Sequence, residues 1–305
     1  MSKPSVRSRL VKAVLRLIRR KQRLTSVENA HRAIAKNRAE KKVTPSTGMR
    51  SRVNVSHSDF EGMEVVRLLP RTGTASTRVL FLHGGCYTFG MVAQHWSFLE
   101  SLVHRLHCQI DVPLYPLAPE HTAPDVFALL LPLYRKLVED GPSDRLHLMG
   151  DSAGGGLALG LAQSLAAERL SQPRALLLLS PWVDLALEDE EIAGLEEHDV
   201  MLSAPGLREC GRLYAGAWGV EDPRVSPLHG DLRGLAPTTV FIGGHDILLP
   251  SCRRLRAKAE EQGAELRYVE APGMSHDWML MPIPEAEWVR DEIVRIVRED
   301  APAAG

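Results

Sequence analysis

A five-residue segment, Gly150-Asp151-Ser152-Ala153-Gly154, constrains the fold more than any other part of the sequence. It follows a short apolar run ending at Met149, which is typical of a buried strand, and it leads into an apolar segment that is typical of a helix. A serine between such a strand and helix lies on a tight turn with a strained backbone and an exposed hydroxyl. Its neighbours must be small because strand and helix approach each other closely there. The segment therefore predicts a nucleophilic serine, Ser152.

Two other classes of protein use similar segments. A phosphate-binding loop would need the lysine of G-x-x-x-x-G-K-[ST] or the spacing of G-x-G-x-x-G, and neither is present here. A chymotrypsin-like protease has its serine in a similar run, but it is all-β and its histidine and aspartate precede the serine. The long helix predicted directly after Ser152 excludes that class.

Along most of the chain, short apolar runs alternate with amphipathic segments. The apolar runs predict strands over 63–69, 78–82, 108–114, 145–149, 174–179, 238–242 and 265–270. Apolar residues at helical spacing predict helices at about 94–106, 125–138, 154–170, 250–262 and 285–298. This alternation, with strands that are nearly apolar throughout, is typical of a mostly parallel sheet with helices on both faces.

Two segments do not follow this alternation. Residues 1–45 are predicted to be helical, with an apolar stripe opposite lysine and arginine residues that consists of Leu10, Val14, Leu17 and Ile18. Residues 185–220 are acidic and helix-prone, which suggests a lid inserted into the sheet domain.

A second glycine segment, His83-Gly84-Gly85-Cys86, directly follows the predicted strand 78–82. Acyl transfer requires stabilisation of a developing oxyanion, and rigidly held backbone N–H groups provide it. Gly84 and Gly85 can bring bare backbone close to a substrate. We therefore predict an oxyanion hole made by the N–H groups of Gly84, Gly85 and Ala153.

A nucleophilic serine needs a base, and the base needs an acid that orients it. Where the serine lies on such a strand-to-helix turn, the acid and then the histidine follow it in the chain. Asp246 follows the predicted strand 238–242 and His276 follows 265–270, so these two are the candidates. The residues that compete with them are Asp277, Asp184 and His245. A residue next to His276 in sequence would turn back to its Nδ1 with difficulty, and His245 directly precedes the only well-placed acid. Asp277 and His245 are therefore expected to hold loops in place.

At this point the chain resembles the hormone-sensitive-lipase family of α/β-hydrolases, in its bacterial esterase branch. The matching segments occur in the family's order and spacing over about residues 60–298, and they are His83-Gly84-Gly85, 115–121, 150–155, 179–184, 222–228, Asp246 and His276. The resemblance implies an α/β-hydrolase fold with Ser152 as nucleophile, His276 as base and Asp246 as its partner. It also implies a helical cap made of residues 1–45 and 185–220 on a catalytic domain of residues 46–305.

The resemblance further implies a carboxylesterase that acts on short- to medium-chain esters through an acyl-enzyme, without a cofactor or metal. A lactonase or amidase with the same triad is the alternative among enzymes. A non-catalytic binding protein of the same fold is the alternative from another class, and the presence of His276 argues against it. The chain departs from the family at Cys86, where members usually have a third glycine, and at Pro250, where they often have a second acid.

Charge is distributed unevenly along the 305 residues. Residues 1–50 carry 15 Lys and Arg against two acids, or +13, and the remainder carries 22 against 36, or −14, which sums to the net charge of −1. We expect the apolar stripe of the basic segment to lie on the catalytic domain, with the charges solvated; binding to anionic lipid or to nucleic acid is the less favoured alternative.

The four cysteines form no C-x-x-C pair, which fits a reducing, cytoplasmic compartment. A small-molecule ester is the expected partner, and a homodimer is left open.

Overall fold

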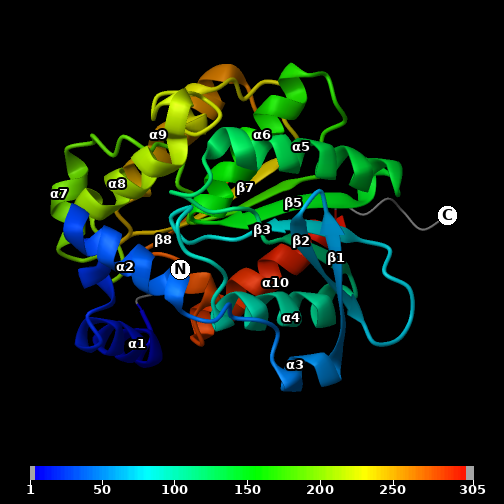
Figure 1. Ribbon diagram of the computed structural model, residues 1–305, viewed down its shortest axis with the longest axis horizontal. Helices are drawn as coiled ribbons and strands as arrows, with labels where there is room; N and C mark the ends of the chain where they lie inside the picture. The colour runs from blue at the N-terminus through cyan, green and yellow to red at the C-terminus, as the bar shows by residue number, and fades with distance from the viewer. Residues whose placement is uncertain (1–3, 300–305) are drawn as a thin grey trace.

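The computed structural model describes residues 4–299, and the strands in that part of the chain form one eight-stranded sheet (Figure 1). The strands are β1 Val53–Phe60, β2 Met63–Pro70, β3 Arg78–Leu82, β4 Gln109–Pro113, β5 Leu146–Asp151, β6 Leu176–Leu179, β7 Thr238–Gly243 and β8 Leu266–Ala271. They lie in the order β1-β2-β4-β3-β5-β6-β7-β8, and all pairs from β4 to β8 are parallel. The predicted α/β fold with a mostly parallel sheet is confirmed.

The antiparallel edge of the sheet was not predicted. β1 and β2 form a hairpin around Glu61 and Gly62, both of which have positive φ, and β2 then pairs antiparallel with β4. β1 lacks the apolar run of a buried strand because most of its side chains are exposed. An edge strand of this kind leaves only a weak signal in the sequence.

Helices cover both faces of the sheet (Figure 1). On one face lie α5 Ala123–Glu139, α6 Ala153–Ala167 and α9 Leu249–Gln262, and on the other lie α4 Ala93–Leu106 and α10 Pro284–Glu299. Side chains of β3 alternate between the two apolar layers, with Leu80 in one and Phe81 in the other. The short elements are α3 Thr47–Arg52 and the 3₁₀ helices Ser143–Arg145, Gly216–Trp218, Pro227–His229 and Trp278–Leu280. Among the helices of residues 4–299, none is long and apolar enough to cross a bilayer.

The two segments expected to form a cap lie together over one end of the sheet (Figure 1). They comprise α1 Val6–Leu17, the 3₁₀ helix η1 Arg20–Leu24 and α2 Val27–Ala39 from the first segment, and α7 Glu191–Glu196 and α8 Ala204–Ala215 from the second. Gly206 of α8 packs so closely on η1 that a Cβ there would lie 2.5 Å from the Leu24 backbone. His31 of α2 also reaches Glu209 of α8, at 2.7 Å. These contacts join the basic N-terminal segment to the acidic insertion.

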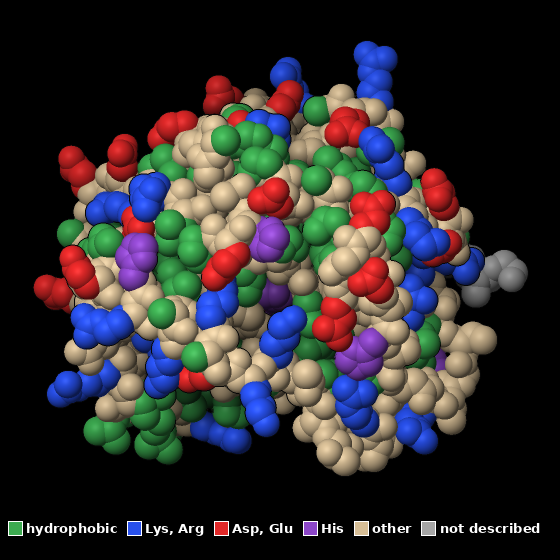
Figure 2. Space-filling view, in the orientation of Figure 1, with side chains coloured by type: hydrophobic (Ala, Val, Ile, Leu, Met, Phe, Trp, Pro, Cys, Tyr) green, Lys and Arg blue, Asp and Glu red, His purple; other side chains and the backbone are tan. Residues whose placement is uncertain are grey.

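The orientation of α1 corrects one prediction. Leu10, Val14, Leu17 and Ile18 were expected to be buried, but their exposed fractions are 63%, 47%, 82% and 62%. Figure 2 shows apolar surface at the lower left of the molecule, near the place of α1 in Figure 1. The helix instead faces the body with Ser8, Val11, Lys12 and Leu15, because Lys12 donates to the Gly273 carbonyl, at 2.6 Å. This polar anchor sets which face is inward.

The exposure of Leu17 gives a stability prediction. Leu17→Ala is expected to change the free energy of unfolding by less than about 0.5 kcal/mol, as exposed substitutions usually do. Leu24→Ala, which removes a side chain that is only 5% exposed, is expected to cost about 2–5 kcal/mol. Urea unfolding of both variants measures the difference. Equal losses in the two variants would mean that the outer face of α1 is buried after all.

Candidate active site

Ser152 lies on a strained turn between β5 and α6, with φ 52° and ψ −120°. The turn needs small neighbours, since a Cβ on Gly150 would lie 2.2 Å from the Gly154 carbonyl oxygen. A Cβ on Gly154 would in turn lie 2.0 Å from the carbonyl oxygen of Leu82 on β3. The glycines of the segment therefore allow α6 to start directly against the sheet, which holds the serine hydroxyl at the strand end.

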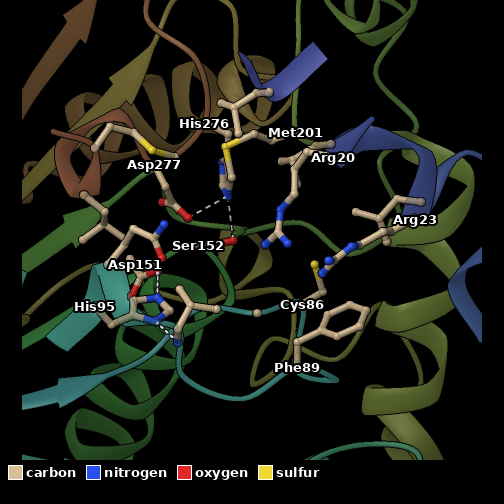
Figure 3. A pocket seen from close by; sticks show the side chains of 18 of the residues that line it. Arg20, Arg23, Cys86, Phe89, His95, Asp151, Ser152, Met201, His276 and Asp277 are labelled. Atoms are coloured by element: carbon tan, nitrogen blue, oxygen red, sulfur yellow. Dashed lines mark hydrogen bonds and ion pairs between the residues drawn. The ribbon is translucent and has the colours of Figure 1, made fainter. Parts of the chain in front are cut away.

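His276 connects Ser152 to Asp246 (Figure 3 shows the contact with the serine). Its Nε2 lies 2.9 Å from Ser152 Oγ, and its Nδ1 lies 2.8 Å from Asp246 Oδ2. The other Asp246 oxygen accepts the Leu248 N–H at 3.0 Å, which fixes the carboxylate. The histidine and the aspartate follow β8 and β7, as the sequence predicts for an acid and a base. The structure thus brings together the three residues predicted to form the triad.

The environment of His276 acts on its pKa in opposite directions. Burial disfavours the charged imidazolium, but the carboxylates of Asp246 and Asp277 outweigh burial and raise the pKa well above its usual value. Because both carboxylates favour the protonated ring, the imidazolium that forms when a serine proton is taken up is stabilised in advance.

Asp277 lies closer to the reacting atoms than its expected role in holding a loop requires. Its Oδ2 is 3.1 Å from His276 Nε2, the same nitrogen that faces the serine, while its N–H donates to Ser180 Oγ (Figure 3 shows the contact with the histidine). Its Oδ1 is buried and has no hydrogen-bond partner among residues 4–299. Burial and the neighbouring charges of Asp151 and Asp246 raise the pKa of Asp277 to about 6. As predicted, Asp277 is not the partner of Nδ1; its contact with Nε2 was not foreseen.

The oxyanion hole differs from the prediction at one residue. The Gly84 N–H donates to Asp151 Oδ1 at 2.9 Å, so it is occupied and does not face a substrate. Asp151 is itself fixed by His95, whose Nε2 lies 3.0 Å from its Oδ2. In the described chain, the N–H groups of Gly85 and Cys86 have no such acceptor, and both residues line the cavity at Ser152. Gly84 therefore shapes the loop, and Cys86 replaces it as a candidate donor beside Gly85 and Ala153.

The positive φ of Cys86, 53°, explains why this position is usually a glycine in the family that the sequence resembles. The thiol is buried, and burial raises its pKa well above the usual range, so it is an unreactive group. The other departure, Pro250, lies at the start of α9, where a proline needs no N–H partner.

The remaining competing residues hold loops. Asp184 pairs with Arg254 of α9 at 3.0 Å, away from the triad. His245 lies 3.1 Å from Lys12 Nζ and stacks on His198, so α1 is tied to the loop that carries Asp246. Glu120, within the matching segment 115–121, likewise holds a loop, since it pairs with Arg38, which also donates to two loop carbonyls. No group of three or more His, Cys, Asp or Glu residues in the described part of the chain is arranged to hold a metal ion.

A cavity of about 250 Å³ opens in front of Ser152 and His276. The cap provides much of its wall, through Leu15, Ile18, Arg20, Arg23, Leu24, Met201 and Leu202. Ile18 is the one member of the predicted stripe that reaches this wall. A second cavity of about 510 Å³ shares Arg20 and Arg23 with the first. The two segments expected to form a cap thus line much of the space in front of the serine.

Comparisons with known proteins agree with this geometry. Residues 79–280 match a family model described as an α/β-hydrolase fold. An esterase from Acinetobacter venetianus is 34% identical over 219 residues, which cover 70% of this chain and 72% of the relative. An acetyl-hydrolase from Streptomyces hygroscopicus is 32% identical over 227 residues, which cover 74% of each chain. The crystal structure of an esterase from the bacterial hormone-sensitive lipase family superposes with a TM-score of 0.83 at 25% identity, over 98% of this chain and 99% of the other.

Proposed function

The chain belongs to the α/β-hydrolase fold family, in its hormone-sensitive-lipase-like branch, and we propose that it is a serine carboxylesterase that uses Ser152, His276 and Asp246. The observation that carries this proposal is the position of His276, which contacts Ser152 Oγ with one ring nitrogen and Asp246 with the other. The class of carboxylic ester hydrolase also agrees with the names of the relatives, an esterase and an acetyl-hydrolase.

In the first half of the reaction, Ser152 Oγ attacks the ester carbonyl carbon while its proton moves to His276 Nε2. Asp246 keeps the other proton of the ring on Nδ1, so that Nε2 is the nitrogen free to act as base. The negative charge that develops on the carbonyl oxygen is bound by the N–H groups of Gly85, Cys86 and Ala153. The imidazolium then protonates the leaving alcohol, which leaves an acyl group on Ser152.

In the second half, His276 takes a proton from water, and the resulting hydroxide attacks the acyl carbonyl. Collapse of this intermediate returns the proton to Ser152 and releases the carboxylic acid. The same N–H groups bind the oxyanion in both halves, since it forms at the same carbonyl oxygen. These steps use only groups of this chain and a water molecule.

The size of the cavity supports short- to medium-chain acyl groups as substrates. The test is a series of p-nitrophenyl esters from acetate to palmitate, with lactones and amides beside them. We expect turnover of the acetate to hexanoate esters to exceed that of palmitate by about 100-fold. A hexadecanoyl chain cannot be buried in the cavity of about 250 Å³ at Ser152 and would have to extend past Arg20 and Arg23 toward the second cavity. Preferred hydrolysis of lactones or amides would favour the alternative reactions of the same triad, and the absence of any turnover would favour a binding protein.

A further inference from the structure

Two arginines of the cap project into the cavity that contains the proposed nucleophile (Figure 3). Arg20 and Arg23 both belong to η1. This 3₁₀ helix begins directly after Arg19, whose left-handed backbone separates it from α1. Side chains three residues apart eclipse each other in a 3₁₀ helix, so the two guanidinium groups lie on one side. In Figure 3 the Arg20 side chain extends toward Ser152, with Arg23 next to it and farther out.

Neither guanidinium group has a carboxylate partner in the described part of the chain. Within residues 4–299, no ion pair or hydrogen bond joins Arg20 or Arg23 to a carboxylate. Neighbouring cations of the same segment are satisfied differently: Lys21 donates to the Glu196 carbonyl, and Arg38 pairs with Glu120. The two acids that face the cavity are also engaged, since Asp151 binds His95 and Gly84 while Asp277 contacts His276.

The placement of these two charges is unfavourable in the empty cavity. Burial and the charge of Arg23 lower the pKa of Arg20, and Cys86 and Asp277 oppose this only in part. A half-buried cation beside a like charge costs free energy unless an anion compensates it. Arg20, with Arg23 beside it, is therefore stabilised when a negatively charged ligand enters the cavity.

We propose that Arg20 and Arg23 form a subsite for a carboxylate, so that the preferred substrates are esters that carry a negative charge in addition to the ester group. The reaction itself rests on the carboxylesterase function proposed above. Guanidinium groups suit this role because their planar N–H pairs match the two oxygens of a carboxylate. Arg20, which is half-buried, makes the inner contact, and Arg23, which is exposed, makes the outer one.

The position of the subsite between two cavities admits the carboxylate on either side of the ester bond. Two matched pairs of substrates distinguish these cases. Monoethyl adipate and ethyl hexanoate differ in a carboxylate at the end of the acyl chain, whereas 4-acetoxybenzoate and p-tolyl acetate differ in a carboxylate on the alcohol side. For at least one pair, we expect the anionic ester to have the higher kcat/KM in the wild-type enzyme, mainly through a lower KM.

Variants at the two arginines measure the origin of this preference. Arg20→Gln is expected to lower the ratio of anionic to neutral kcat/KM by about 10- to 100-fold, the effect of losing one hydrogen bond between charged groups. Arg23→Gln should lower it by a smaller factor, and Arg20→Lys should retain part of it. The control is Arg32→Gln, which removes the same charge from an exposed position on α2 and should leave the ratio unchanged. An equal loss for both members of a pair in Arg20→Gln would mean that the arginine only supports the cap, and this would overturn the proposal.

A binding measurement separates this inference from the proposed reaction. Calorimetry with the Ser152→Ala protein compares the affinity for the anionic and neutral members of each pair without turnover. Tighter binding of the anionic esters, lost in the double variant with Arg20→Gln, supports the subsite even if the reaction were assigned incorrectly. Equal affinity within each pair would overturn the subsite while leaving a carboxylesterase that hydrolyses neutral esters intact.

Discussion

Ser152→Ala is expected to reduce kcat/KM for p-nitrophenyl butyrate by about 10⁴- to 10⁶-fold, since residues of a triad act as a unit and losing one removes most of the rate enhancement. The loss should fall on kcat rather than on KM, because the cavity and the N–H groups of Gly85, Cys86 and Ala153 remain. The fold should persist, as alanine at this turn keeps the same backbone conformation with one atom fewer. Steady-state kinetics together with thermal unfolding measure both expectations.

Ser164→Ala is the matched control for this experiment. Ser164 lies on the same helix, α6, and its hydroxyl donates to the Gly160 carbonyl, away from the cavity. Its loss should leave activity near that of the wild type. If Ser152→Ala kept comparable turnover while remaining folded, another nucleophile would have to be sought, and the assignment of Ser152 would be wrong.

The sequence predicted the central sheet well because its strands are buried on both faces. Runs such as 176–179, which contains only leucine, have no polar alternative, and their alternation with amphipathic helices leaves few arrangements. The same reasoning did not find β1, whose residues are mostly exposed and whose pairing depends on a two-residue turn. Strand periodicity is informative only where burial enforces it.

The outer face of α1 illustrates a different limit. The stripe of Leu10, Val14, Leu17 and Ile18 has the spacing of a buried face, but these side chains are exposed and the adjacent face of the helix packs on the body. The bond from Lys12 to Gly273 and its contact with His245 tie the helix to loops that carry the triad. These contacts connect residues more than 230 positions apart. The local sequence of neither segment predicts them.

At the site, motif order was sufficient to find Ser152, Asp246 and His276, but not the use of each backbone N–H. The direction of the Gly84 N–H is set by Asp151, whose carboxylate accepts this N–H. The sequence shows Asp151 as the acid directly before Ser152. Its role in binding the Gly84 N–H depends on His95, which lies on a separate helix and holds the Asp151 carboxylate. The contact of Asp277 with Nε2 likewise depends on a left-handed backbone, φ 49°, which sequence alone does not reveal.

Asp246→Asn is expected to lower kcat by about 10⁴-fold, the scale of losing the correct imidazole tautomer in a triad. The amide oxygen of the variant can still accept the N–H of Leu248, which turns the NH₂ group toward His276 Nδ1. That nitrogen must then be unprotonated, so the proton moves to Nε2 and the base no longer accepts a proton from Ser152. Single-turnover kinetics with a chromogenic ester measure the acylation rate directly.

Asp277→Asn is the comparison that separates the two acids. Asparagine tolerates the left-handed backbone at this position, so the substitution removes mainly the charge. The loss at the pH optimum should be less than about tenfold, since Asp246 still orients the ring and a single lost contact is worth about 1 kcal/mol. The carboxylate of Asp277 favours the imidazolium form of His276, so its removal lowers the pKa of His276. Since the base acts only when neutral, the acidic limb of the kcat/KM profile should move to lower pH.

An acidic limb that stays in place in Asp277→Asn would mean that Asp277 only holds its loop. An inactive Asp277→Asn protein beside an active Asp246→Asn protein would exchange the roles of the two acids.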